Sequence, residues 1–165
     1  MRRLLFILIA AAGIGVASPA AADEFFDAPG GWTTYVNDRF GIQLDFPPDV
    51  FEPQPPPENG EGRGFRGEDA AMQVLGFQNL EEETPRSIKS RVSKTEGYED
   101  VTYSPSGQNW LVLSGFRGDR IFYEKYFFSG GIVSVLGLEF PAEEKPFFAP
   151  IIERMEDSFE PGESD

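Results

Sequence analysis

Three consecutive apolar segments in the second half of the chain restrict its fold more than any other feature. They are residues 110–116, 120–128 and 132–140. The dipeptides between them, Gly118-Asp119 and Gly130-Gly131, suit tight hairpin turns, so the segments predict an antiparallel meander. Apolar residues occupy both alternating sets of positions in these segments. Strands of this kind require a covering layer on each face of their sheet.

Two predicted helices supply covering layers. Thr84 and Pro85 favour the start of a helix that extends to about residue 95, although only Ile88 and Val92 mark its apolar stripe. A second helix is predicted to begin at Pro150, and its apolar residues recur at helical spacing through residue 159. The predicted fold class is therefore α+β, with a central antiparallel sheet and helices on both faces.

The first half of the chain adds shorter strands and a loop. Strands are predicted at residues 33–36, 40–46, 64–66 and 71–77, and the segment 40–46 alternates apolar with polar or small residues. Residues 51–62 hold four prolines and two glycines, which predicts a surface loop.

The amino-terminal segment has the three parts of a secretory signal. Arg2 and Arg3 precede an apolar run from residue 4 to 16, and small residues end at Ala22. We expect residues 1–22 to be a cleavable signal peptide that directs the protein to the periplasm or the medium without a membrane anchor. The predicted organisation continues with a flexible leader at 23–31, a single α+β domain at 32–160 and a tail at 161–165.

Charge and composition exclude several classes of function. The net charge is −14, and removal of residues 1–22 leaves 12 basic against 28 acidic residues, a net charge of −16. Such a domain repels nucleic acid and anionic membranes. The chain contains no histidine and no cysteine. Disulfides, thiolate nucleophiles, Ser-His-Asp triads and histidine-bound zinc are excluded, and we expect no metal and no cofactor.

Four segments carry a resemblance to a known family. They are WTTYVNDRFGIQLDF at 32–46, PQPPPENGEGRGF at 53–65, LSGFRGDRIFYEK at 113–125 and LEFPAEEKPFFAPIIERMEDSF at 138–159. Together they resemble a family of exported alphaproteobacterial proteins of unknown function with a PsbP-like α/β/α sandwich layout. The resemblance implies a central antiparallel sheet between helical layers and a binding or accessory role by analogy of fold. It brings no catalytic residues.

A pair of carboxylates is the candidate site. If Gly130-Gly131 forms a two-residue turn, Glu124 lies opposite Gly137, and Glu139 becomes its diagonal neighbour on the same face. With Tyr126 beside them, Glu124 and Glu139 are predicted ligand-binding residues. Two carboxylates so placed also allow an alternative reading, acid and nucleophile in a glycan hydrolase.

Two short motifs have simpler explanations. Residues 62–67 match G-x-G-x-x-G, but a dinucleotide site needs that pattern between a strand and a helix, and here prolines precede it. The tripeptide Arg117-Gly118-Asp119 is explained by a hairpin tip.

Three hypotheses of function follow from the sequence. The leading one is a non-enzymatic envelope protein that binds a partner protein or small ligand through loops at the sheet edge. The alternatives are the glycan hydrolase and a structural or stress-protective factor without a ligand.

Overall fold

The predicted meander is present in the computed structural model, which describes residues 23–163. Strands β8 (Trp110–Arg117), β9 (Arg120–Ser129) and β10 (Ile132–Pro141) pair antiparallel. Their turns fall at Gly118-Asp119 and Gly130-Gly131, where all three glycines adopt positive φ. The hairpin tip thus accounts for Arg117-Gly118-Asp119.

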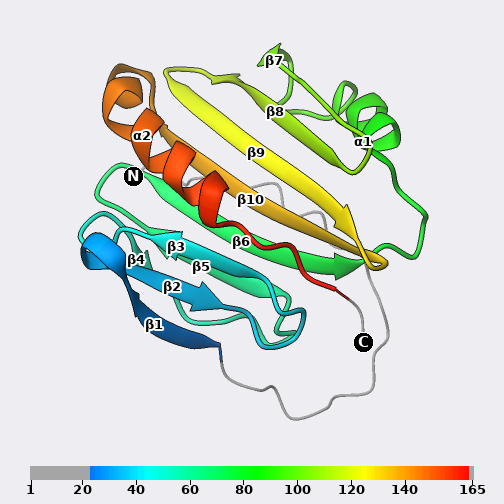
Figure 1. Ribbon diagram of the computed structural model, residues 1–165. Helices are drawn as coiled ribbons and strands as arrows, with labels where there is room; N and C mark the ends of the chain where they lie inside the picture. The colour runs from blue at the N-terminus through cyan, green and yellow to red at the C-terminus, as the bar shows by residue number, and fades with distance from the viewer. Residues whose placement is uncertain (1–22, 164–165) are drawn as a thin grey trace.

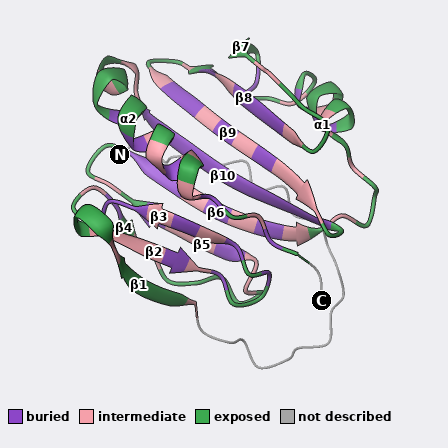
Figure 2. Cartoon of the chain, viewed as in Figure 1, coloured by how far each residue is buried: buried purple, intermediate pink, exposed green. Residues whose placement is uncertain are grey.

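The meander belongs to a seven-stranded antiparallel sheet (Figure 1). The sheet order is β4-β5-β6-β10-β9-β8-β7. The remaining strands are β4 (Glu52–Pro53), β5 (Gly62–Arg66), β6 (Ala71–Gln78) and β7 (Asp100–Tyr103). Strand β10 lies at the centre and is buried from Ile132 to Phe140, so neither face of the sheet is open there (Figure 2).

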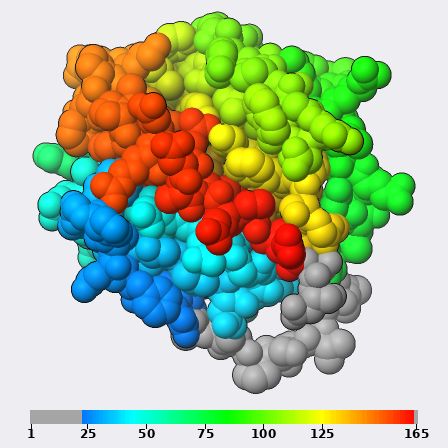
Figure 3. Space-filling view, in the orientation of Figure 1, coloured from blue at the N-terminus to red at the C-terminus, as the bar shows by residue number. Residues whose placement is uncertain are grey.

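One face is covered by a second sheet and the carboxy-terminal helix. Strands β1 (Glu24–Ala28), β2 (Trp32–Val36) and β3 (Gln43–Phe46) form the small sheet, and α2 (Lys145–Ser158) lies beside it. Gln43 of β3 and Glu160, which follows α2, exchange two backbone hydrogen bonds. These bonds join the small sheet and the helical segment into one layer. Figure 3 shows this layer as a blue-to-cyan region beside an orange-to-red band.

The opposite face is covered by α1 (Pro85–Val92). Thr84 caps its first turn, as the sequence indicated, and Ser87 caps it in return by accepting from the Thr84 backbone N–H. Ile88 and Val92 are buried against Leu111 and Leu113 of β8 in a second apolar cluster. Helices therefore lie on both faces of the central sheet, and the predicted fold class is confirmed.

The predicted leader at 23–31 requires correction, because residues 24–28 form β1 and pair with β2 along their whole length. Asp23 forms an ion pair with Arg63 at 2.8 Å, and the Phe25 ring packs on the rings of Tyr35 and Phe46. Hydrogen bonding and ring packing thus hold a segment that was predicted to be a flexible leader.

The carboxy-terminal boundaries also differ from the prediction. Helix α2 begins at Lys145, so Pro150 lies inside it. The segment expected to be a tail is attached at Gly162, whose backbone N–H donates to the buried Ser134 hydroxyl at 2.9 Å. In the region expected to be a loop, β4 is a short strand and Phe51 is buried.

The predicted signal peptide at 1–22 lies outside the described residues. Neither helix within residues 23–163 is both long enough and apolar enough to cross a lipid bilayer.

We predict that Gly76→Ala destabilises the protein by about 1–3 kcal/mol. A methyl group at Gly76 would lie 2.6 Å from Ile42 Cδ1 and 2.7 Å from Phe40 Cδ2, where the connection between β2 and β3 packs on β6. Gly64→Ala is the matched control, because no atom lies within 4 Å of its added methyl group. Urea unfolding measures both variants, and equal stabilities would contradict the close packing of the two sheets.

Candidate functional site

The structure brings the three predicted site residues together. Glu124 pairs with Gly137, and Glu139 pairs with Phe122, which is the predicted register. Glu124, Tyr126 and Glu139 lie on the α1 face of the sheet. Both carboxylates are buried, with residue exposures of 7% and 6%.

A single arginine joins the two carboxylates. Arg117 Nη2 lies 3.1 Å from Glu124 Oε1, and Arg117 Nη1 lies 3.2 Å from Glu139 Oε2. The third nitrogen, Nε, donates to the Gly97 carbonyl at 2.9 Å. The guanidinium also lies over the Phe122 ring at 4.2 Å. Arg117 therefore occupies the space between the two acids.

The remaining carboxylate oxygens also have partners. Tyr98 Oη lies 2.9 and 2.8 Å from the two oxygens of Glu124, and Tyr126 Oη donates to Glu124 Oε2 at 2.8 Å. On the other acid, Arg120 Nε donates to Glu139 Oε1 at 3.0 Å. Every oxygen of the pair thus accepts at least one hydrogen bond.

The electrostatics of this cluster keep Tyr98 and Tyr126 neutral and Arg117 charged. Burial raises the pKa of Tyr98 and of Tyr126 above the usual value, and the negative charge of Glu124 raises both further. Burial alone would lower the pKa of Arg117, but Glu124, Tyr98 and Glu139 together raise it. The tyrosines remain neutral donors, and Arg117 remains a cation.

This arrangement favours a structural role over catalysis. A glycosidase needs two carboxylates with a sugar between them. Here the guanidinium of Arg117 stands at that position, and breaking its contacts would leave buried charges without partners. The cluster ties the end of the α1 segment, through Gly97 and Tyr98, to the sheet.

A second site lies on the opposite face, where α2 ends and strands β8 and β9 continue uncovered. It is a groove of about 330 Å³. Four aromatic side chains line it: Tyr103, Trp110, Tyr123 and Phe127. Val112 contributes a wall that is only 4% exposed, whereas Tyr103 is 58% exposed. We call this feature the aromatic groove.

Polar groups gather at the side of the aromatic groove that α2 forms. Lys125 Nζ lies 2.6 Å from Glu156 Oε1, and Tyr123 Oη is hydrogen-bonded to the same oxygen at 2.5 Å. Burial raises the pKa of Tyr123, and the hydrogen bond to Glu156 raises it further. The groove therefore presents flat apolar rings beside a fixed ion pair, a combination that orients small ligands.

Sequence reasoning missed the aromatic groove. The signal was present, because the hairpin register places Trp110 opposite Phe127 and Val112 opposite Lys125 on one face. What the sequence did not reveal is that α2 leaves this part of the sheet uncovered.

A metal ion requires a set of ligand side chains around one point. Within residues 23–163 no group of three or more histidine, cysteine, aspartate or glutamate side chains is placed to hold one.

Comparison with known proteins shows the fold. No protein-family model matches the chain, and no curated protein sequence matches it. Among solved structures, the chain is similar to the solution structure of cyanobacterial PsbP (CyanoP) from Synechocystis sp. PCC 6803. The TM-score is 0.62 at 13% identity, over 93% of this chain and 98% of that one. The chain therefore has a PsbP-like fold, which alone does not define what it binds.

We predict that Arg117→Ala destabilises the protein by about 3–5 kcal/mol, because Glu124 and Glu139 then remain buried without a cation between them. The control is Arg66→Ala at an exposed position, with an expected change within about 0.5 kcal/mol. Chemical unfolding of both variants gives the comparison. A loss in Arg117→Ala as small as that of the control would show that the cluster contributes no stability.

We predict that the protein loses stability as the pH rises above about 10. Burial raises the folded-state pKa of four of the five tyrosines: Tyr35, Tyr98, Tyr123 and Tyr126. The unfolded chain then binds fewer protons than the folded one. The free energy of unfolding therefore falls by up to about 1.4 kcal/mol per pH unit for each tyrosine.

Urea unfolding at pH 8 and pH 11, with tyrosinate absorbance followed in parallel, checks this expectation. Most of the tyrosinate signal should appear together with unfolding. Ionisation of all five tyrosines near pH 10 with the fold intact would contradict it.

Proposed function

We propose that this chain is an exported, non-enzymatic binding module that holds a small ligand in the aromatic groove. The observation that carries the proposal is the groove itself, where the exposed ring of Tyr103 and the partly buried rings of Trp110, Tyr123 and Phe127 lie beside the Lys125–Glu156 ion pair. Partly exposed aromatic rings that line a concave site support a binding role.

The size and chemistry of the groove favour a small ligand. Its volume of about 330 Å³ lies at the lower end of ligand pockets. The rings of Trp110 and Tyr103 offer flat apolar surfaces, and the charged groups of Lys125 and Glu156 offer a donor and an acceptor. A saccharide unit meets both demands, because it has an apolar C–H face and a rim of hydroxyl groups.

Export is supported by the amino-terminal sequence pattern alone. The charged start, the apolar run and the small residues before Asp23 are typical of a cleaved secretory signal. A module delivered this way works in the periplasm or the medium, where glycans and small metabolites are accessible ligands.

The hydrolase alternative receives less support. Glu124 and Glu139 are the carboxylates it would use, and both are paired with arginines beneath the α1 layer rather than exposed in the aromatic groove. The groove has one carboxylate, Glu156, which is held by Lys125 and Tyr123.

We predict that at least one sugar in a panel of mono- and disaccharides changes the fluorescence of Trp110. The experiment uses Trp32→Phe, in which Trp110 is the remaining tryptophan, and a panel of mono- and disaccharides. Stacking of a ligand on the indole should give a saturable change for at least one member. Tyr123→Ala in the same background should weaken binding by tenfold or more.

Phe116→Ala is the matched control, because Phe116 is an exposed aromatic residue of β8 outside the groove. Its affinity should equal that of the parent. Two outcomes would contradict the proposal. One is release of reducing sugar from the panel, which indicates an enzyme. The other is a flat response across the panel, also in melting temperature, which favours a partner protein or a factor without a ligand.

A further inference from the structure

The segment around α1 has a charge unlike the rest of the chain. Residues 84–95 contain four basic residues and no acidic one, although the whole chain carries a net charge of −14. The four are Arg86, Lys89, Arg91 and Lys94. The segment also contains five hydroxyl side chains. A basic, hydroxyl-rich helix is therefore exposed on an acidic protein.

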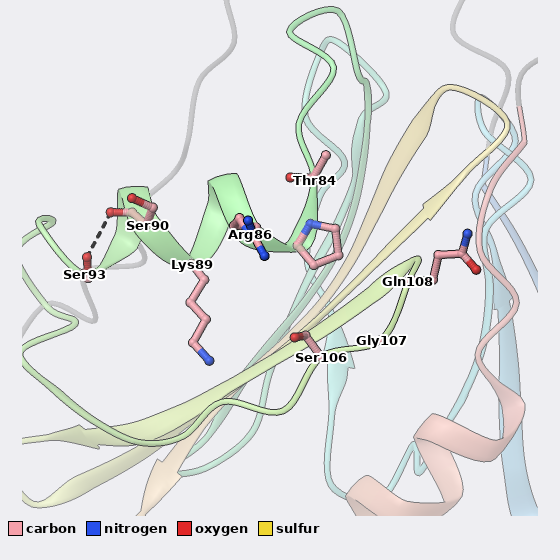
Figure 4. Close-up of a pocket in the computed structure, with 9 residues that line it drawn as sticks. Thr84, Arg86, Lys89, Ser90, Ser93, Ser106, Gly107 and Gln108 are labelled. Atoms are coloured by element: carbon pink, nitrogen blue, oxygen red, sulfur yellow. Dashed lines mark hydrogen bonds between the residues drawn. The ribbon is translucent and has the colours of Figure 1, made fainter.

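Two of these basic residues line a pocket between α1 and the loop that joins β7 to β8. The pocket has a volume of about 670 Å³. Arg86 and Lys89 line it together with Thr84, Ser90, Ser93, Ser106 and Gln108, and Figure 4 shows these residues on α1 and on the loop. None of the residues that line it is acidic. We call it the basic pocket.

The two cations lack partners of opposite charge. Arg86 forms no ion pair with any described residue, and Lys89 Nζ donates to the Ser104 carbonyl at 2.9 Å. The acid nearest in sequence, Glu83, pairs instead with Arg91, which lies outside the pocket. The positive charge of the pocket is therefore not neutralised within the residues that the structure describes.

The loop wall of the basic pocket is held in place. Lys89 ties the loop to α1 through Ser104, and the backbone N–H of Gly107 donates to the Trp110 carbonyl at 2.9 Å. Gly107 also packs directly on the indole, because a methyl group there would lie 2.2 Å from Trp110 Nε1. A fixed wall lowers the entropy that a ligand loses on binding.

We infer that the basic pocket binds a phosphoryl group. A guanidinium, an ammonium and the hydroxyl groups of Ser90 and Ser106 around one cavity match the oxygens of that anion, and charge-assisted hydrogen bonds are the stronger kind. The acidic surface elsewhere opposes the approach of an anion only within a Debye length, about 8 Å at physiological salt. This site is separate from the aromatic groove, and its ligand does not depend on the function proposed for that groove.

Amide chemical shifts in NMR spectra test this inference. The probes are inorganic phosphate and glycerol 3-phosphate, with glycerol as the neutral control. Saturable shifts should centre on Ser90, Ser106 and Gly107 for both phosphates, and glycerol should give none. Tighter binding of the ester would identify a phosphorylated small molecule as the ligand, and equal binding would identify the free anion.

Two double variants separate a built site from general charge. Arg86→Gln with Lys89→Gln should weaken phosphate binding by tenfold or more. Arg66→Gln with Lys145→Gln removes the same charge at exposed positions outside the pocket, and the affinity should stay within twofold. Equal losses in both variants, or shifts that spread over the chain without saturation, would overturn the inference. Unchanged melting temperatures of the unliganded variants show that folding is not the cause.

Discussion

Burial of β10 on both faces is the constraint on which the rest of the structure depends. Its residues alternate between two apolar clusters, with Leu136 and Leu138 on one side and Val133 and Val135 on the other. Each face must exclude water, so each requires a layer. The small sheet and α2 cover one face, and α1 covers the other. Both candidate binding sites lie toward the β8 and β7 edge of the sheet.

The α1 layer is thin for the area it covers, since only Ile88 and Val92 of that helix are buried. The ion-pair cluster extends the layer. Arg117 reaches from β8 to the Gly97 carbonyl, and the Tyr98 hydroxyl binds Glu124, so the segment after α1 is fastened to the sheet by polar contacts. Buried charges are costly unless fully paired, and here each carboxylate oxygen has a partner. Glu124 and Glu139, predicted from the sequence as ligand-binding residues, thus help to hold a covering layer on the sheet.

The sequence predicts those features that depend on neighbouring residues, and it does not predict contacts between separate segments. Turn chemistry is local, so Gly130-Gly131 fixed the hairpin register and placed Glu124 beside Glu139 correctly. Ion pairs and ring contacts between different segments could not be predicted. Nothing near Glu124 indicated that Arg117 would neutralise it, and nothing in residues 23–31 indicated that Phe25 would pack on Tyr35. The aromatic groove was missed for a similar reason, because it depends on where α2 stops.

The loop between β7 and β8 contributes residues to both candidate sites. Pro105 of this loop faces the aromatic groove, and Ser106 faces the basic pocket, so the two sites lie on opposite sides of a few residues at the edge of the sheet. Trp110 serves both, as its ring lines the groove and supports Gly107. The aromatic groove includes Tyr123, Lys125 and Phe127 of β9, whereas the residues that line the basic pocket come from α1, its two ends and the loop. Both candidate sites therefore lie toward the β7 edge of the sheet, and each includes residues of this loop.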